Sequence, residues 1–186
     1  VIHNAATSGV GSYLITLAKM RGIKTVNVVR RESLVEPLKA AGADVVLVDG
    51  DDLAERVKAA TDGAAIRLGI DAVGGAATDR LGAALSEGAT LVNYGALSGE
   101  PCLLAPTVII FKDITVRGFW LAKWFRTATP EQQKELYGTL TGLIATGKLS
   151  APVHATYPVK DIKEAVAVAA EGGRNGKIVI VGDGLA

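Results

Sequence analysis

The first eleven residues, from Val1 to Gly11, constrain the fold of this chain more than any other segment. An apolar start, a short turn and a helical pattern follow one another here, and a strand joined to a helix in this way opens a βαβ unit. Dinucleotide-binding folds carry the glycine pattern G-x-G-x-x-G in that turn. In this chain the three glycine positions hold Ala6, Ser8 and Gly11, so the turn is a degenerate form of the fingerprint.

Arg30 and Arg31 follow the second apolar run, where dinucleotide-binding folds usually carry an acidic residue that binds the ribose 2′-hydroxyl. A carboxylate there repels a 2′-phosphate, whereas a guanidinium binds it through two parallel hydrogen bonds. The reversed charge therefore predicts NADP(H) rather than NAD(H) as the cofactor. Backbone N–H groups at the helix N-terminus and the Ser8 hydroxyl are expected to bind the pyrophosphate. The alternative is a solvated pair of surface arginines on a loop.

Further apolar runs follow the first strand, and helical patterns separate them. Runs without polar alternation are typical of strands that helices cover on both faces. Six strands that alternate with helices predict an α/β fold with a doubly wound, parallel six-stranded Rossmann sheet. After the first strand, the predicted strands are Thr25 to Val29, Val45 to Val48, Ile66 to Val73, Thr90 to Tyr94 and Asp113 to Trp120. Capping boxes predict helix starts at Ser33 with Glu36, Asp52 with Glu55, and Thr129 with Gln132.

The order of elements changes at Lys148, where a strand–helix–strand tail begins. The predicted tail holds a strand from His154 to Val159, a helix capped by Asp161 and Glu164, a glycine-rich loop, and a strand from Lys177 to Val181. Two strands and one helix bury too little apolar surface to stand alone. We therefore expect an NADP(H)-binding domain over residues 1–147, and over 148–186 the C-terminal segment of a catalytic domain that begins upstream. The absence of an initiator Met at Val1 agrees with this expectation.

Charge and composition exclude several classes of partner and site. Lysine and arginine number 20 against 19 acidic residues, so no electrostatic feature indicates nucleic acid or an anionic membrane. No apolar run is long enough to predict a membrane span. Cys102 is the only cysteine, which excludes an internal disulfide and favours an inert thiol. His3 and His154 lie in apolar strands and are expected to be hydrogen-bonded structural residues.

Ligands of such folds bind beyond the carboxyl ends of the strands. This rule selects the 7–11 turn, the two arginines, residues 72–75 and residues 94–97. Gly74 and Gly75 fit two interpretations equally, a plain turn or a close approach of the nicotinamide ribose. Tyr94 is interpreted as a packing or cofactor-edge contact in preference to a proton donor. Phe119, Trp120 and Trp124 are expected in the core or in an interface.

These motifs together resemble the medium-chain dehydrogenase/reductase superfamily, and within it the trans-2-enoyl thioester reductases of the mitochondrial type and their bacterial relatives. The segment with Phe119 and Trp120 is the most specific, because zinc-free quinone reductases share the first motifs. The resemblance covers essentially the whole chain. Its motifs are residues 4–11, 27–30, 71–75, 94–95 and 110–113, continuing through 117–121 to Trp124.

The resemblance implies NADPH contacts along the whole crevice. The implied contact residues are Thr7, Ser8, Gly9, Val10, Arg30, Arg31, Tyr94, Gly95, Ala96, Leu97, Phe119, Trp120, Leu121 and Lys177. It further implies hydride transfer to the C=C bond of a 2-enoyl thioester, assisted by a tyrosine of the upstream catalytic region. Tyr13, Tyr94, Tyr137 and Tyr157 do not correspond to that tyrosine, so no catalytic residue is assigned and this piece by itself is expected to be inactive. Glu32 departs from the family pattern, which often has a further basic residue there.

Other expectations follow from the same resemblance. Family members pair edge strands, so a homodimer through the strand Asp113 to Trp120 is expected. No metal ligand is assigned, and the resemblance disfavours zinc. The protein is expected in the cytoplasm of a bacterium or in the mitochondrion of a eukaryote. Two alternatives stay open: an NADPH-dependent quinone or enone reductase, which the upstream tyrosine would distinguish, and a non-catalytic NADPH-binding module.

Overall fold

The structure is a computed structural model that describes residues 1–171 and 176–182. Its contacts divide the chain into two compact units, Val1–Tyr137 and Gly138–Ala186, which are described separately below. The domain boundary expected after residue 147 stays a prediction. No helix in the described part of the chain has both the length and the apolar composition needed to cross a membrane.

The first unit is built on a six-stranded sheet in the order β3-β2-β1-β4-β5-β6, with parallel pairing throughout. Strand order reverses between β1 and β4, so the predicted doubly wound parallel sheet is confirmed. The third strand has the predicted bounds, whereas the second, fourth, fifth and sixth strands are shorter than the sequence predicted. The strands are β1 (Ile2–His3), β2 (Val26–Val29), β3 (Val45–Val48), β4 (Leu68–Asp71), β5 (Thr90–Asn93) and β6 (Thr115–Gly118).

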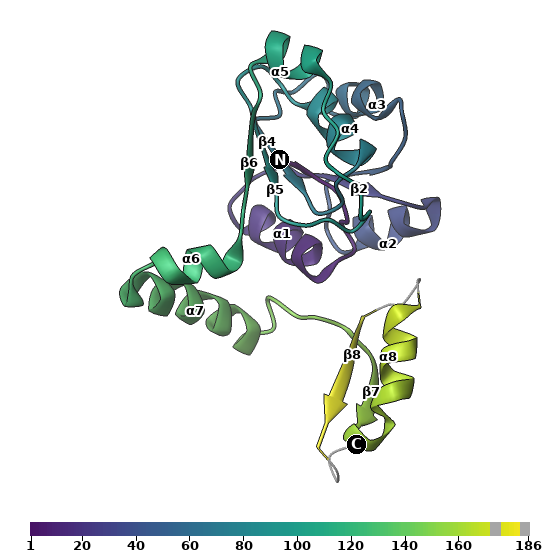
Figure 1. Cartoon of the computed structure of the whole chain (residues 1–186), viewed down its shortest axis with the longest axis vertical. Helices are drawn as coiled ribbons and strands as arrows, with labels where there is room; N and C mark the ends of the chain where they lie inside the picture. Colours follow the sequence, from purple (N-terminus) through teal and green to yellow (C-terminus); the bar gives the residue numbers. More distant parts are fainter. Residues whose placement is uncertain (172–175, 183–186) are drawn as a thin grey trace. The chain divides into compact units, whose positions relative to one another are not determined.

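Helices cover both faces of this sheet (Figure 1). One buried cluster joins α1 and α2 to Val29 and Val46, and a second joins α3 and α4 to Val28 and Leu91. All four residues of β2 are buried, including the polar Asn27, whose side chain is hydrogen-bonded to His3 and to the Val45 carbonyl oxygen. The helical elements are α1 (Gly9–Met20), η1 (Glu32–Leu34), α2 (Val35–Ala40), α3 (Leu53–Ala60), α4 (Ala76–Ala84), α5 (Pro106–Lys112), α6 (Leu121–Thr127) and α7 (Pro130–Ala145).

One of the three predicted capping boxes in this unit forms. Thr129 Oγ1 accepts from the Gln132 N–H at 3.2 Å, and Gln132 Oε1 accepts from the Thr129 N–H at 2.9 Å. The box at Ser33 is wrong, because Ser33 lies inside η1 and α2 begins only at Val35. The box at Asp52 is also wrong, because its carboxylate instead contacts Arg56 Nη2 at 2.8 Å.

The second unit contains a parallel strand pair joined by a helix. The unit begins within α7, and after the end of that helix it contains β7 (Val153–Pro158), η2 (Val159–Asp161), α8 (Ile162–Ala170) and β8 (Lys177–Val181). The predicted order strand, helix, strand is confirmed, and β8 has the predicted bounds. Asp161 is the N-cap residue of α8, but its side chain makes no cap hydrogen bond, so the predicted cap is wrong. Residues 172–175 of the predicted glycine-rich loop lie outside the described residues.

Candidate functional site

The turn between β1 and α1 leaves backbone N–H groups available to a ligand. Ser8 is the N-cap residue of α1, and its Oγ accepts from the Gly11 N–H at 3.1 Å. Within the described residues, the N–H groups of Gly9 and Val10 have no acceptor. They lie at the positive end of a helix of 12 residues, at the point where strand order reverses. This geometry is suited to a phosphate group.

Gly11 is required by the packing of α1 against the turn. A Cβ atom at this position would lie 2.5 Å from the Ala6 carbonyl oxygen and 2.7 Å from that of Ala5. Both contacts are to backbone, which cannot move aside as a side chain can. The third glycine of the fingerprint is therefore kept for close packing of the helix on the strand, whereas Ala6 and Ser8 replace the other two.

Arg30 and Arg31 lie at the carboxyl end of β2, the strand next to β1. Both residues are exposed, and neither side chain makes a hydrogen bond or ion pair in the part of the chain that the structure describes. Most other arginines near this edge are paired: Arg56 contacts Asp52, and Arg80 contacts Asp49. Two free guanidinium groups next to the phosphate turn fit a second anionic group on the same ligand.

A buried carboxylate joins the strand ends on the other side of the turn. Asp71, the last residue of β4, is 0% exposed. It accepts hydrogen bonds from Asn4 Nδ2 (2.6 Å), Thr78 Oγ1 (2.6 Å), Asn93 Nδ2 (3.1 Å), and the N–H groups of Val73 (2.8 Å) and Gly74 (3.1 Å). Burial alone would raise the pKa of Asp71, but these donors outweigh it and lower the pKa below its ordinary value.

The loops after β4 and β5 are bound to each other. The N–H groups of Leu97 and Ser98 donate to Ala72 and Val73 carbonyl oxygens at 3.1 and 2.9 Å. A Cβ atom on Gly95 would lie 2.7 Å from the Ala72 oxygen, so the approach of the two loops requires glycine there. Gly74 and Gly75 both have positive φ, 79° and 59°, as the turn interpretation requires. The interpretation as a ribose contact is not tested by this geometry.

Tyr94 lies half-buried between these loops and the phosphate turn. Burial raises the pKa of Tyr94, the charge of Asp71 adds to the increase, and an interaction with the Ser8 side chain opposes it. The phenol is therefore a hydrogen-bond donor at neutral pH. Its interaction with Ser8 brings the 7–10 and 94–97 segments of the predicted site together.

A shallow cleft of about 410 Å³ continues the site toward β6. It is lined by Asn93, Tyr94, Gly95, Ala96, Gly118, Phe119, Trp120 and Lys123. Phe119, Trp120 and Leu121 are each about half exposed or more, so the first two do not lie in the core, and their expected place in an interface stays a prediction. The Arg126 guanidinium lies 4.8 Å from the Trp120 ring centroid. The aromatic segment therefore belongs to the same edge as the predicted cofactor residues.

The remaining residues singled out in the sequence lie elsewhere. Lys177 is exposed on β8 in the second unit, so its predicted cofactor contact stays a prediction. His3 is buried and its Nε2 lies 2.6 Å from Asn27 Oδ1, which confirms its structural role. Burial lowers the pKa of His3. His154 is exposed and makes no side-chain hydrogen bond within the described residues, so the same prediction is wrong for it. Cys102 is an exposed free thiol.

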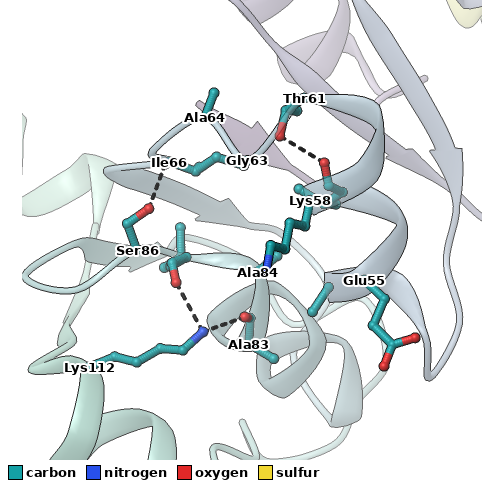
Figure 2. A pocket seen from close by; sticks show the side chains of 13 residues that line it. Glu55, Lys58, Thr61, Gly63, Ala64, Ile66, Ala83, Ala84, Ser86 and Lys112 are labelled. Atoms are coloured by element: carbon teal, nitrogen blue, oxygen red, sulfur yellow. Dashed lines mark hydrogen bonds between the residues drawn. The ribbon is translucent and has the colours of Figure 1, made fainter.

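A second cleft of about 320 Å³ lies at the opposite, amino-terminal edge of the sheet (Figure 2). Residues that precede β4, β5 and β6 line it, including Ile66, Ser86 and Lys112. Lys112 Nζ donates to the carbonyl oxygens of Ala83 (2.6 Å) and Leu85 (3.1 Å). Lys112 therefore caps the C-terminus of α4, which accounts for a lysine in the 110–113 motif by structure rather than by ligand binding.

The described residues do not form a metal centre. In residues 1–171 and 176–182, no three His, Cys, Asp or Glu side chains come together closely enough to hold a metal ion. Sequence reasoning missed two other polar arrangements, the Asp71 group and the pairing of Asp49 with Arg80. Asn4 lies 67 residues from Asp71 in the chain, and Arg80 lies 31 residues from Asp49, so no local motif marks these pairs.

The profile of the zinc-binding dehydrogenase family matches residues 9–138. The mitochondrial enoyl-[acyl-carrier-protein] reductase of Rattus norvegicus is 37% identical over 171 residues, which are 89% of this chain and 46% of that protein. The human enzyme of the same name is also 37% identical over 171 residues, with the same coverage of both chains. The chain thus spans about half the length of the curated relatives it matches.

Solved structures of reductases superpose on nearly the whole of this chain. A putative NADPH:quinone reductase from Bacillus thuringiensis superposes with a TM-score of 0.85 at 26% identity, covering 95% of this chain and 54% of that one. The Etr1p complex with NADP and crotonyl-CoA superposes with a TM-score of 0.84 at 22% identity, covering 97% and 53%. The second likeness is one of fold alone.

Proposed function

The chain belongs to the zinc-binding dehydrogenase family, within the medium-chain dehydrogenase/reductase superfamily, and on this basis we propose that it is the NADPH-binding portion of an enoyl thioester reductase. The mitochondrial relatives reduce enoyl groups on acyl carrier protein according to their names, and the whole enzyme is proposed to reduce the C=C bond of a 2-enoyl thioester in the same way.

The free Arg30 and Arg31 at the end of β2 are the observation that carries the cofactor assignment. A 2′-phosphate is the group that separates NADPH from NADH, and it needs cations where NADH needs a carboxylate. The turn that holds Ser8, Gly9 and Val10 lies one strand away and supplies N–H donors for the pyrophosphate. The residues present therefore fit NADP(H) at two separate points along the ligand.

The proposed chemistry assigns positioning roles to this chain. Bound NADPH supplies the hydride that reduces the β-carbon of the enoyl thioester. Tyr94, Gly95 and the 96–97 backbone hold the nicotinamide end beside the cleft of about 410 Å³ at the carboxyl edge. Phe119, Trp120 and Leu121 provide an apolar wall that excludes water from this end. Donors to the thioester carbonyl are proposed to come from the part of the enzyme upstream of Val1.

A quinone or enone reductase is the second candidate. It is supported by the Bacillus thuringiensis structure, which is more similar in sequence to this chain than the Etr1p complex is. Both activities use the same cofactor crevice, so the residues described above do not separate them. Steady-state rates of the full-length enzyme with crotonyl-CoA and with a benzoquinone, each with NADPH, distinguish the two candidates.

We also propose a homodimer through β6. This strand lies at the edge of the sheet, and all four of its residues are exposed. Ile110, Phe111 and Val116 are 67%, 76% and 46% exposed on and beside it. An unpaired edge with apolar neighbours favours strand pairing with a second copy. Light scattering of the full-length protein tests this proposal.

The cellular location is proposed to depend on the source organism: the mitochondrion in a eukaryote and the cytoplasm in a bacterium.

Isothermal titration of NADPH and NADH into wild-type and Arg30→Ala protein tests the cofactor assignment. Loss of this guanidinium should weaken NADPH binding by about 1.5–3 kcal/mol, the contribution of a hydrogen bond to a charged group. NADH binding should be almost unchanged, because NADH has no group at the 2′ position that needs a cation. Equal losses for both cofactors would contradict the assignment of Arg30 to the 2′-phosphate.

A further inference from the structure

Arg30 has an acidic neighbour on the adjacent strand. Val29 of β2 pairs with Val48 of β3, and the Asp49 N–H donates to the Val29 carbonyl oxygen at 2.7 Å, so the ladder continues one step past the strand ends. Arg30 and Asp49 are the next residues in this register. Cα atoms of neighbouring strands lie about 5 Å apart. The two oppositely charged residues are therefore adjacent in the sheet.

Because side chains alternate between the two faces of a strand, the Arg30 and Asp49 side chains lie on the same face of the sheet. Val28 and Leu47 are register partners, and both pack in the cluster that involves α3 and α4. Residues two positions further along a strand point to the same face. Arg30 and Asp49 thus follow Val28 and Leu47 on the face covered by α3 and α4. An ion pair between them would be the simplest outcome of this arrangement.

Asp49 instead pairs with Arg80 of α4. Arg80 Nε donates to Asp49 Oδ1 at 2.7 Å and Arg80 Nη2 to Asp49 Oδ2 at 2.6 Å, a bidentate geometry that uses both carboxylate oxygens. Both side chains are about four-fifths buried, at 23% and 22% exposure, so the pair is protected from solvent. The hydrogen bonds to Asp49 raise the pKa of Arg80, so its guanidinium stays charged. Arg30 has no ionic partner among the described residues.

We propose that Arg80 is a specificity-determining residue that withholds Asp49 from Arg30. This inference rests on the proposed NADPH site. By binding both oxygens of Asp49, Arg80 keeps the Arg30 guanidinium free for the 2′-phosphate and screens the carboxylate that would repel it. Without Arg80, Asp49 competes with the phosphate for Arg30 and adds a negative charge one strand away from it.

The test is the NADPH and NADH affinity of Arg80→Met, measured by titration of the full-length protein. NADPH affinity should fall about tenfold and NADH affinity should change less than about twofold. The double variant Arg80→Met with Asp49→Asn should regain NADPH affinity to within about twofold of wild type, because the competing charge is gone. A merely structural role for the pair predicts no such rescue.

Arg56→Met is the matched control. Arg56 pairs with Asp52 at 2.8 Å in the same segment, but Asp52 lies beyond the register of Arg30. This variant removes one positive charge from the same edge and should leave the ratio of NADPH to NADH affinity unchanged.

If Arg80→Met does not fold, the titrations are made with Arg80→Lys instead. The lysine keeps the positive charge but cannot bind both carboxylate oxygens of Asp49 in the planar geometry of a guanidinium. The NADPH affinity of this variant should fall by about threefold.

Three results would overturn the inference: equal losses for NADPH and NADH, no loss for NADPH, or no rescue by Asp49→Asn. The Arg30→Ala titration separates this failure from a failure of the proposed function. If Arg30→Ala weakens NADPH selectively and Arg80→Met does not, the cofactor site stands and only the role of Arg80 is wrong. If Arg30→Ala has no selective effect, the NADPH assignment itself is wrong.

Discussion

The two halves of the carboxyl edge of the sheet differ in how their charged groups are satisfied. On the β2 side, Arg30 and Arg31 are exposed and have no ionic partner within the described residues. On the β4 and β5 side, Asp71 is fully buried and accepts hydrogen bonds from two neighbouring strand ends and from its own loop. Free charge suits the capture of an anionic ligand, whereas a satisfied buried charge fixes the position of loops.

This difference leads to opposite expectations for substitutions. A change at the exposed arginines should alter cofactor affinity and leave the free energy of unfolding almost unchanged. A change in the Asp71 group should lower the free energy of unfolding first, and should affect binding only because the loops move. Each prediction below tests one side of this contrast, with the largest expected effect first.

Asp71→Ala should destabilise the protein by about 3–5 kcal/mol, because it removes a buried charge and leaves several buried donors without an acceptor. Urea unfolding followed by circular dichroism measures the change. Arg31→Ala is the control from the other half and should change stability by less than about 0.5 kcal/mol. Similar effects for the two variants would mean that the halves do not differ as described.

Asp71→Asn provides a pH-dependent test of the same group. The pKa of Asp71 is lowered from its ordinary value of 3.8 in the folded protein, so the carboxylate stabilises the fold above that value. This contribution is lost as pH falls through 3.8 toward the lower pKa of the folded state. The stability difference between wild type and Asp71→Asn should be about 2 kcal/mol near pH 7. Urea titrations should give the same difference down to about pH 5 and a smaller one below about pH 4. A difference that grows on acidification would contradict the lowered pKa.

Strands β1 to β5 were predictable because each is a short, largely apolar run that packs between the two layers of helices, whereas β6 is exposed. Two helices were not predicted. The α5 segment contains Val108, Ile109 and Ile110, β-branched residues that favour strands, and only Pro106 at its start marks a helix. The α6 segment carries Trp124 and Phe125, with no buried stripe to show a period. The two helices precede and follow β6 in the sequence.

The site was predictable where the chemistry lies in consecutive residues. Ser8, Gly11 and Arg30 occupy fixed offsets from a strand and a helix, so their positions follow from the βαβ unit. The Asp71 group depends instead on Asn4 and Asn93, which topology alone brings together. Contacts that the sequence pattern does not rank also decided the outcome for a local motif. The capping box at Asp52 did not form, because the Asp52 carboxylate pairs with Arg56, one turn along α3, instead of with a backbone N–H group.

Ala5→Gly gives the smallest predicted effect and tests the turn where the two halves meet. Ala5 has φ 48°, in the left-handed region, and its carbonyl oxygen accepts from the Ser8 N–H at 2.8 Å. Glycine removes a Cβ penalty of about 1–2 kcal/mol. The added freedom of the unfolded chain offsets about 0.5–1 kcal/mol of this gain. We expect a net stabilisation of about 0.5 kcal/mol by thermal unfolding, with NADPH affinity unchanged.

The neighbouring Ala6→Gly is the control, since Ala6 is fully buried and its φ is not positive. It should destabilise by about 1 kcal/mol. Equal destabilisation by both changes would show that the turn at Ala5 is not strained.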